Sequence, residues 1–208
     1  MDIEEKIKSI KRSFRLYMNG VASHSMREKG LDYKLNWGIS QADLRHIAAS
    51  YDKDAALARR LWADNVRECK ILATLLMPPT AMSVDEAVSW VTQAPSLETV
   101  ESLVFGVLQH VDDAPALVGT ILSAEESKAN ALLRLCAYHL QCRLARRGVP
   151  VPQHSASLLL ESASADIHSE DIAMLRAVVN CLQAVADTQP DLSARVADVL
   201  KTIGLDLF

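Results

Sequence analysis

The sequence has 208 residues, of which half are hydrophobic but only 5% are aromatic, and it carries a formal net charge of −4. A chain of this length can bury a sizeable core, and apolar positions filled mainly by Leu and Ala are typical of close-packed helices rather than of a sheet. The negative balance excludes a uniformly basic nucleic-acid binder, although it is compatible with a locally basic groove. We therefore expect an all-α protein.

No targeting or membrane-spanning segment is evident in the sequence. Residues 1–12 alternate charged and apolar side chains in a helical pattern, unlike a secretory signal or an Arg-rich, acid-poor transit peptide. No apolar run approaches the roughly 18 residues that a spanning helix needs. We expect a soluble, cytoplasmic protein with no membrane partner.

The cysteines and the familiar catalytic motifs give no sign of a metal or a cofactor. Cys69, Cys136, Cys142 and Cys181 are scattered through helical patterns without a Cys-x-x-Cys pair, so we expect reduced and mostly buried thiols. His139 and Cys142, three residues apart, do not complete a four-coordinate zinc site and are interpreted as a packed pair. A Gly-rich phosphate loop, a Gly-x-Ser-x-Gly elbow and a His-Glu-x-x-His pattern are all missing. We predict no cofactor and no metal.

Helix start and stop signals recur along the chain. Apolar residues at helical spacing predict a first helix over residues 3–18, which the Asn19-Gly20 pair ends. Ser40 caps a second helix that runs to about Tyr51. One further helix passes through Leu57 and Leu61. The remaining predicted helices lie at about 66–77, at 83–92, from 96 onward, and at about 114–122, 125–147, 155–164, 169–187 and 190–203. The sequence thus predicts about eleven helices and no strand.

These helices form pairs of similar length. The pairs begin near residues 53, 83, 114, 155 and 190, so that the unit recurs about every 30 to 41 residues. Helix pairs with this spacing are typical of an α-α superhelix, in which each pair buries its apolar face against its neighbours. An irregular helical bundle is the alternative interpretation.

A segment of the amino-terminal half resembles a known family. Gly38-Ile39, Leu44-Arg45, Leu61-Trp62 and Arg67-Glu68 follow one another in the order found in the DNA alkylation repair family of HEAT-like repeat proteins. The resemblance is most specific over residues 36–110. It implies one HEAT-like α-solenoid domain over 1–208, with a helical cap at 1–35 and repeats over 36–208. It further implies a concave basic face that holds duplex DNA, and a DNA glycosylase activity that releases cationic alkylated purines.

The stretch SLETVESLVFGVLQ is similar to the active-site helix of that family, which usually begins Trp-Asp-x-Val-Asp. In this alignment Leu97 replaces the Trp, Glu98 replaces the first Asp and Glu101 replaces the second. The resemblance implies that Glu101 is the catalytic carboxylate, whose charge stabilises an oxocarbenium-like sugar as the glycosidic bond breaks.

Other groove positions of the family are changed. The groove Arg falls near Asn130 or Ala131, with Arg134 one turn away, and a second groove Trp falls near Asn180. Without the aromatic rings, the carboxylate has no flat faces beside it for cation–π contact with a cationic nucleotide. We therefore expect glycosylase activity to be weak or lost.

Each candidate residue also has a purely structural interpretation. With Ser96 as the N-cap, the two glutamates are explained as acidic groups near a helix start, which the helix dipole stabilises by about 0.3–1 kcal/mol. The basic residues form two clusters, Arg59, Arg60, Arg67 and Lys70 in the amino-terminal half and Arg143, Arg146 and Arg147 near the end of the long helix. These clusters are interpreted as solvated helix faces or as phosphate contacts.

The sequence therefore predicts a protein that binds duplex DNA in a concave groove. The residues expected at the DNA are Arg59, Arg67, Lys70, Leu97, Glu98, Arg134, Arg143 and Asn180, with Glu101 as the candidate catalytic residue. A protein-interaction scaffold without enzymatic activity is the alternative, because superhelices present long surfaces that bind proteins as readily as DNA.

Overall fold

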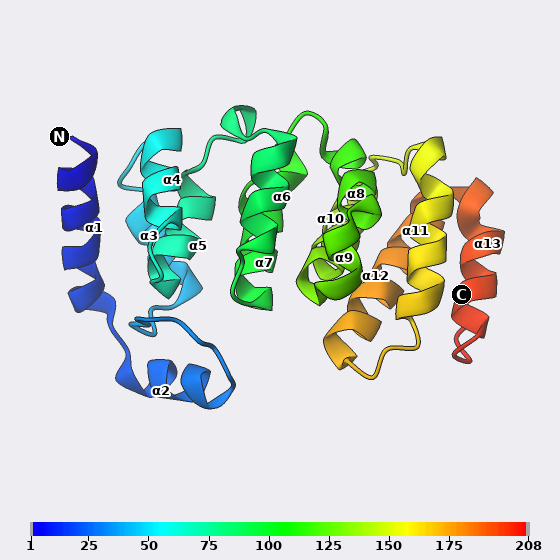
Figure 1. Ribbon diagram of the computed structural model, residues 1–208, viewed down its shortest axis with the longest axis horizontal. Helices are drawn as coiled ribbons and strands as arrows, with labels where there is room; N and C mark the ends of the chain where they lie inside the picture. Colours follow the sequence, from blue (N-terminus) through cyan, green and yellow to red (C-terminus); the bar gives the residue numbers. More distant parts are fainter. Residues whose placement is uncertain (1, 207–208) are drawn as a thin grey trace. The chain divides into compact units, whose positions relative to one another are not determined.

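The computed structural model describes residues 2–206, which form thirteen α-helices and two short 3-10 helices (Figure 1). The prediction of an all-α fold is confirmed. Two more α-helices are present than the eleven expected from the sequence. The chain divides into two compact units, unit 1 up to Ser83 and unit 2 from Val84 onward. The single domain over 1–208 and its cap at 1–35 stay predictions.

Unit 1 is built around α5, which packs against α3 and α4, while α1 also packs against α3 and α4. Its helices are α1 (Ile3–Tyr17), α2 (Gly20–Glu28), α3 (Gln41–Ala48), α4 (Ala55–Trp62), α5 (Arg67–Leu76) and the 3-10 helix η1 (Pro79–Ala81). Nine of the ten residues of α5 are buried. This helix therefore forms the centre of the unit 1 core.

Unit 2 consists of helices that pack in two layers. Its elements are α6 (Val84–Thr92), α7 (Leu97–Gly106), η2 (Leu108–His110), α8 (Ala114–Ser123), α9 (Glu125–Ala129), α10 (Ala131–Arg146), α11 (Gln153–Asp166), α12 (Ile172–Thr188) and α13 (Pro190–Lys201). In one layer α10 packs against both α7 and α12, and in the other α11 packs against both α8 and α13. The pairs α8 with α10 and α11 with α12 join the layers. Each of these four helices thus buries one face against the other layer.

Asparagine side chains account for both additional helices. Asn19 follows the end of α1, as expected, but its side chain also accepts a hydrogen bond from the Ala22 amide and so begins α2. Asn130 has an extended backbone and accepts from the Leu132 amide. The helix predicted over 125–147 is therefore divided into α9 and α10, because an asparagine N-cap starts a new helix at the point where the earlier one stops.

The Arg67-Glu68 pair of the family resemblance lies in the interior of unit 1. Its side chains are 1% and 0% exposed, and Arg67 Nη1 lies 3.0 Å from Glu68 Oε1. The Glu68 carboxylate also accepts hydrogen bonds from the Trp37 and Ile39 amides at 3.2 and 3.3 Å, while Arg67 donates to the Ile39 carbonyl at 2.9 Å. This pair therefore fixes the loop that leads into α3.

The same loop requires a glycine at position 38. Gly38 has a φ of +70°, in the left-handed region that favours glycine. A Cβ atom there would lie 2.2 Å from the Asn19 carbonyl oxygen and 2.6 Å from the Ser23 amide nitrogen. Both the backbone conformation and the close approach of α2 therefore exclude a side chain.

All four cysteines are free and buried, as expected from the sequence. Burial raises the pKa of the Cys69 thiol to about 12, and burial likewise raises the pKa of Cys136 and Cys181. At neutral pH these groups are protonated, and they pack as small apolar side chains. Across residues 2–206, every helix is too short or too polar to cross a lipid bilayer.

Replacing Glu68 by Ala should destabilise the protein strongly. The substitution removes the carboxylate that compensates the buried Arg67 guanidinium, which typically costs about 3–5 kcal/mol of unfolding free energy. Urea denaturation monitored by circular dichroism measures this loss. Glu28→Ala is the matched control, since the Glu28 side chain is 66% exposed and its ion pair with His24 contributes at most about 1 kcal/mol. Equal stability of the two variants would contradict the structural role of the buried pair.

Candidate functional site

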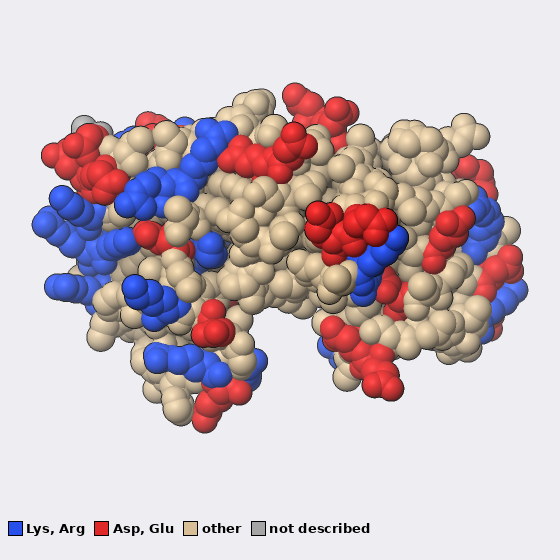
Figure 2. All heavy atoms as spheres, viewed as in Figure 1, with Lys and Arg blue, Asp and Glu red and all other residues tan. Residues whose placement is uncertain are grey.

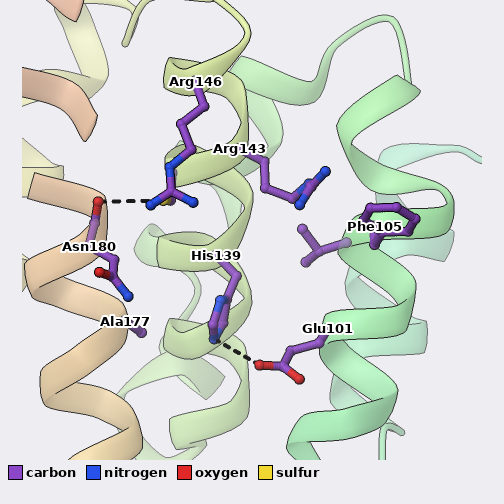
Figure 3. A pocket seen from close by; sticks show the side chains of 9 residues that line it. Glu101, Phe105, His139, Arg143, Arg146, Ala177 and Asn180 are labelled. Carbon is purple, nitrogen blue, oxygen red and sulfur yellow. Dashed lines mark hydrogen bonds and ion pairs between the residues drawn. The ribbon is translucent and has the colours of Figure 1, made fainter. Parts of the chain in front are cut away.

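Three neighbouring helices of unit 2 line a pocket of about 230 Å³ (Figure 3). We call it the unit 2 pocket. Its lining residues are Glu101, Val104 and Phe105 from α7, His139, Cys142, Arg143 and Arg146 from α10, and Ala177 and Asn180 from α12. The pocket thus combines one carboxylate, one imidazole, two guanidinium groups and one aromatic ring.

The packing of α10 determines which of its side chains reach the pocket. Ten of its sixteen residues are buried, because α7 and α12 lie on either side of it and α8 lies in the other layer. His139, Arg143 and Arg146, at positions i, i+4 and i+7, lie on one stripe that remains open to the pocket. The negative end of the helix dipole also favours the two arginines, which lie in the last turn.

The two glutamates of α7 lie at different distances from the start of the helix. The Ser96 side chain accepts a hydrogen bond from the Thr99 amide at 3.3 Å, so the predicted N-cap is confirmed and Glu98 lies in the first turn. Glu101 lies one turn further along, where the N-terminal dipole no longer accounts for it. Its side chain is 53% exposed and lines the pocket. The helix start therefore explains Glu98 but leaves Glu101 available for a function.

Glu101 faces His139 across the pocket (Figure 3). The distance from His139 Nε2 to Glu101 Oε1 is 3.8 Å, and Nε2 is shielded from solvent without a hydrogen-bond partner among the described residues. Burial lowers the pKa of His139, and the Glu101 charge opposes this effect. The imidazole is therefore neutral at neutral pH, and the contact becomes a full ion pair only when acid protonates it.

Arg143 is held in a defined orientation between α7 and α10. Its guanidinium carbon lies 4.5 Å from the centroid of the Phe105 ring, a cation–π arrangement. Its Nε donates to Gln109 Oε1 at 2.9 Å, and Gln109 Nε2 donates to the Phe105 carbonyl at 2.5 Å. Arg147 donates to the Gln109 backbone carbonyl. The end of α7 and the last turn of α10 are therefore joined through one buried glutamine.

Cys142 lies beside Asn180 at the α12 side of the pocket. Its thiol donates a weak hydrogen bond of 3.4 Å to the Asn180 carbonyl, and burial raises its pKa. Through residues 2–206, no group of three or more His, Cys, Asp and Glu side chains is arranged to hold a metal ion. We therefore treat Cys142 as a packing residue of the pocket wall.

The structure brings together three of the residues expected at the DNA or in catalysis. Glu101, Arg143 and Asn180 come from three different helices and line one pocket. Leu97 packs instead against the core of unit 2. Arg134 also lies elsewhere, because it pairs with Asp166 at 2.9 Å and donates to the Ser127 carbonyl.

The three basic candidates of unit 1 have internal partners. Arg67 belongs to the buried pair with Glu68, and Lys70 donates to the Trp62 carbonyl at 2.7 Å with its amine 4.5 Å from the Trp62 ring centre. Burial lowers the pKa of Lys70. Arg59 is exposed on α4 and donates to the Ala81 carbonyl at 2.9 Å. Arg67 and Lys70 were expected to contact phosphates. Both lie in the interior of unit 1 instead, because α5 buries nearly its whole surface.

The sequence analysis gave no functional role to Phe105 and interpreted His139 as a packed partner of Cys142, whereas Arg146 belonged to a cluster interpreted as a solvated helix face or as phosphate contacts. Phe105 follows Glu101 by four residues, so it lies on the same face of α7, and it is 46% exposed. His139, Arg143 and Arg146 recur at helical spacing along α10, and this spacing was the signal that could have located the stripe. Gln109 gave no comparable signal, because its function as a connector depends on tertiary contacts.

The two units differ in charge. Unit 1 contains fourteen Lys and Arg residues against ten Asp and Glu, whereas unit 2 contains eight against sixteen. On the face drawn in Figure 2, basic side chains gather over α1. Three of the eight basic residues of unit 2, Arg143, Arg146 and Arg147, lie within five positions at the end of α10. The rim of the unit 2 pocket is therefore locally basic within an acidic unit.

The packed helix pairs define an α-helical repeat protein, and comparisons with known proteins agree with this class. Residues 4–196 match the model of the family described as DNA alkylation repair enzyme, so the chain belongs to this family. No curated protein matches the sequence significantly.

One solved structure is similar over nearly the whole chain. It is described as representing "a new family of proteins related to the HEAT-like repeat DNA glycosylases with affinity for branched DNA structures". The TM-score is 0.78, with 18% identical residues, and the match covers 98% of this chain and 84% of the other. At this level of identity the likeness establishes the fold, which is a HEAT-like helical repeat fold.

Replacing Glu101 by Gln should lower the pKa of His139 further. The carboxylate opposes the desolvation of the imidazolium, and the amide has similar shape without the charge. An NMR pH titration of the His139 ring protons measures the change. Glu98→Gln is the matched control and should leave the His139 pKa where it is, because Glu98 does not line the pocket. An unchanged His139 pKa in Glu101→Gln would contradict the pairing across the pocket.

Proposed function

We propose that this protein binds duplex DNA through the unit 2 pocket and its basic rim, and that its base-release activity on alkylated DNA is weak or lost. The observation that carries the proposal is the convergence of Glu101, Arg143 and Arg146 from two helices of an otherwise acidic unit. Arg146 is exposed and forms no ion pair among the described residues, so its charge is available to a phosphate. Membership of the DNA alkylation repair family supports nucleic acid as the ligand.

The surroundings of Glu101 support weak rather than strong catalysis. Leu97 stands where the family resemblance implies an aromatic residue, and Asn180 stands near a second such position. The carboxylate also lies 3.8 Å from His139 Nε2. A carboxylate that stabilises an oxocarbenium-like transition state must face the sugar in a fixed position, and here the two aromatic residues that the resemblance implies for this purpose are replaced.

Binding of duplex DNA should depend on salt and on Arg146. Fluorescence anisotropy of a labelled duplex, titrated at several salt concentrations, gives the affinity and its salt slope. Arg146→Gln should weaken binding irrespective of sequence and reduce the slope by about one. Arg195→Gln removes another exposed arginine of unit 2, one that does not line the pocket, so it should change neither quantity. Equal losses in the two variants would contradict binding at this pocket.

Base release from alkylated duplex DNA should be slow in the wild-type protein. If Glu101 nevertheless stabilises the transition state, Glu101→Gln should reduce the remaining rate by roughly 100-fold, since such electrostatic contributions are commonly about 3–4 kcal/mol. Chromatographic measurement of free methylated purines under single-turnover conditions tests both statements. Rapid release by the wild type would contradict the proposed loss of activity, and equal rates in the two proteins would exclude a catalytic Glu101.

A protein-interaction scaffold is the second candidate function. The excess of eight acidic residues in unit 2 favours it, as do the internal partners of Arg67 and Lys70. An acidic surface attracts basic proteins and repels nucleic acid. This function would be preferred if duplex DNA were not bound even at low ionic strength, where phosphate contacts are strongest.

A further inference from the structure

The α7–α10 side of the unit 2 pocket presents a flat aromatic and cationic surface. Phe105 is 46% exposed, and the Arg143 guanidinium lies against its ring at 4.5 Å. An exposed aromatic ring next to a planar guanidinium is a surface on which a nucleobase can stack, because every base offers a π face to such a platform. This pair is therefore suited to a planar ligand.

This surface is held in place before any ligand arrives. Gln109 is only 5% exposed, and its amide joins the Arg143 Nε to the Phe105 carbonyl through hydrogen bonds of 2.9 and 2.5 Å. The Arg143 side chain is therefore already ordered, and stacking a ligand on it costs little conformational entropy. A preorganised guanidinium favours a defined contact over diffuse attraction of phosphates.

The size and the polar groups of the pocket restrict the ligand. At about 230 Å³, the pocket is smaller than the roughly 300–1,000 Å³ typical of sites for drug-sized ligands, so it suits one ring system rather than a base pair. The Glu101 carboxylate can accept a hydrogen bond from an exocyclic amino group, and the Asn180 amide can both donate and accept. Arg146 lies at the rim, where a phosphate that follows the base would pass.

We propose that the unit 2 pocket binds one unpaired nucleotide of a DNA strand, with its base against Phe105 and Arg143 and its phosphate at Arg146. The inference rests on the proposed DNA-binding function and names the DNA structure that this site selects. A paired base is stacked on both faces and offers its ring to no protein surface. A base at a bulge or a branch is already partly unstacked, so placing it in the pocket costs least there. Glu101 adds a preference for bases that carry an exocyclic amine.

Three labelled DNAs with the same paired sequence test the proposal by fluorescence anisotropy. The first is fully paired, the second carries one unpaired cytidine, and the third carries an abasic site in place of that cytidine. The wild-type protein should bind the cytidine bulge at least about fivefold more tightly than the other two, since stacking of a single base typically has an effect of this size or larger.

Variants of one exposed residue separate stacking from general effects. Phe105→Ala should abolish the preference for the cytidine bulge over the fully paired duplex, whereas Phe105→Trp should retain that preference. Ile172→Ala truncates another exposed apolar side chain of unit 2, 63% exposed on α12, and should behave as the wild type. Circular dichroism confirms that each variant is folded.

The outcomes distinguish this inference from the proposed function. If the wild type binds the duplex and the cytidine bulge equally, the nucleotide site is excluded while DNA binding stands. If the abasic bulge is bound as tightly as the cytidine bulge, the protein recognises a bent backbone and the stacking proposal is overturned. If none of the three DNAs is bound at low salt, both the nucleotide site and the proposed DNA-binding function are excluded.

Discussion

The burial of α10 between α7 and α12 is the constraint on which the candidate site depends. Ten of the sixteen residues of this helix are inside the unit, so only a narrow stripe of α10 faces the pocket. His139, Arg143 and Arg146 occupy that stripe, and the neighbouring helices add Glu101 and Asn180 on either side. Because a charge on a buried face would require a compensating partner, core packing determines where a functional charge can be placed on this helix.

Family membership and the site address different questions. The family and the HEAT-like repeat fold are established by the match over residues 4–196 and by the similar solved structure, but one fold can carry several functions. The Arg67-Glu68 pair illustrates the distinction, because the residues that most clearly carry the resemblance hold a loop of unit 1 together. The arguments for DNA come instead from the charges and the ring around the unit 2 pocket.

Much of the fold could be predicted from the sequence, whereas the site could be predicted only in part. Capping residues and helical periodicity are local signals, so they located nearly every helix and correctly placed Glu98 at the start of α7. The burial of Lys70 and the contact between Glu101 and His139 depend on which faces of distant helices meet. Local patterns do not contain that information, and two arginine clusters of similar appearance consequently have different environments.

The most direct test of DNA binding at the unit 2 pocket is an NMR titration of the arginine side chains. Resonances of the Arg Nε–Hε groups, assigned by substitution, can be followed while an unlabelled duplex is added at low salt. The account predicts that the Arg143 and Arg146 signals shift in a saturable manner with DNA concentration, while the Arg195 signal on α13 stays in place. Saturable shifts confined to Arg195 or to the arginines of unit 1 would contradict it.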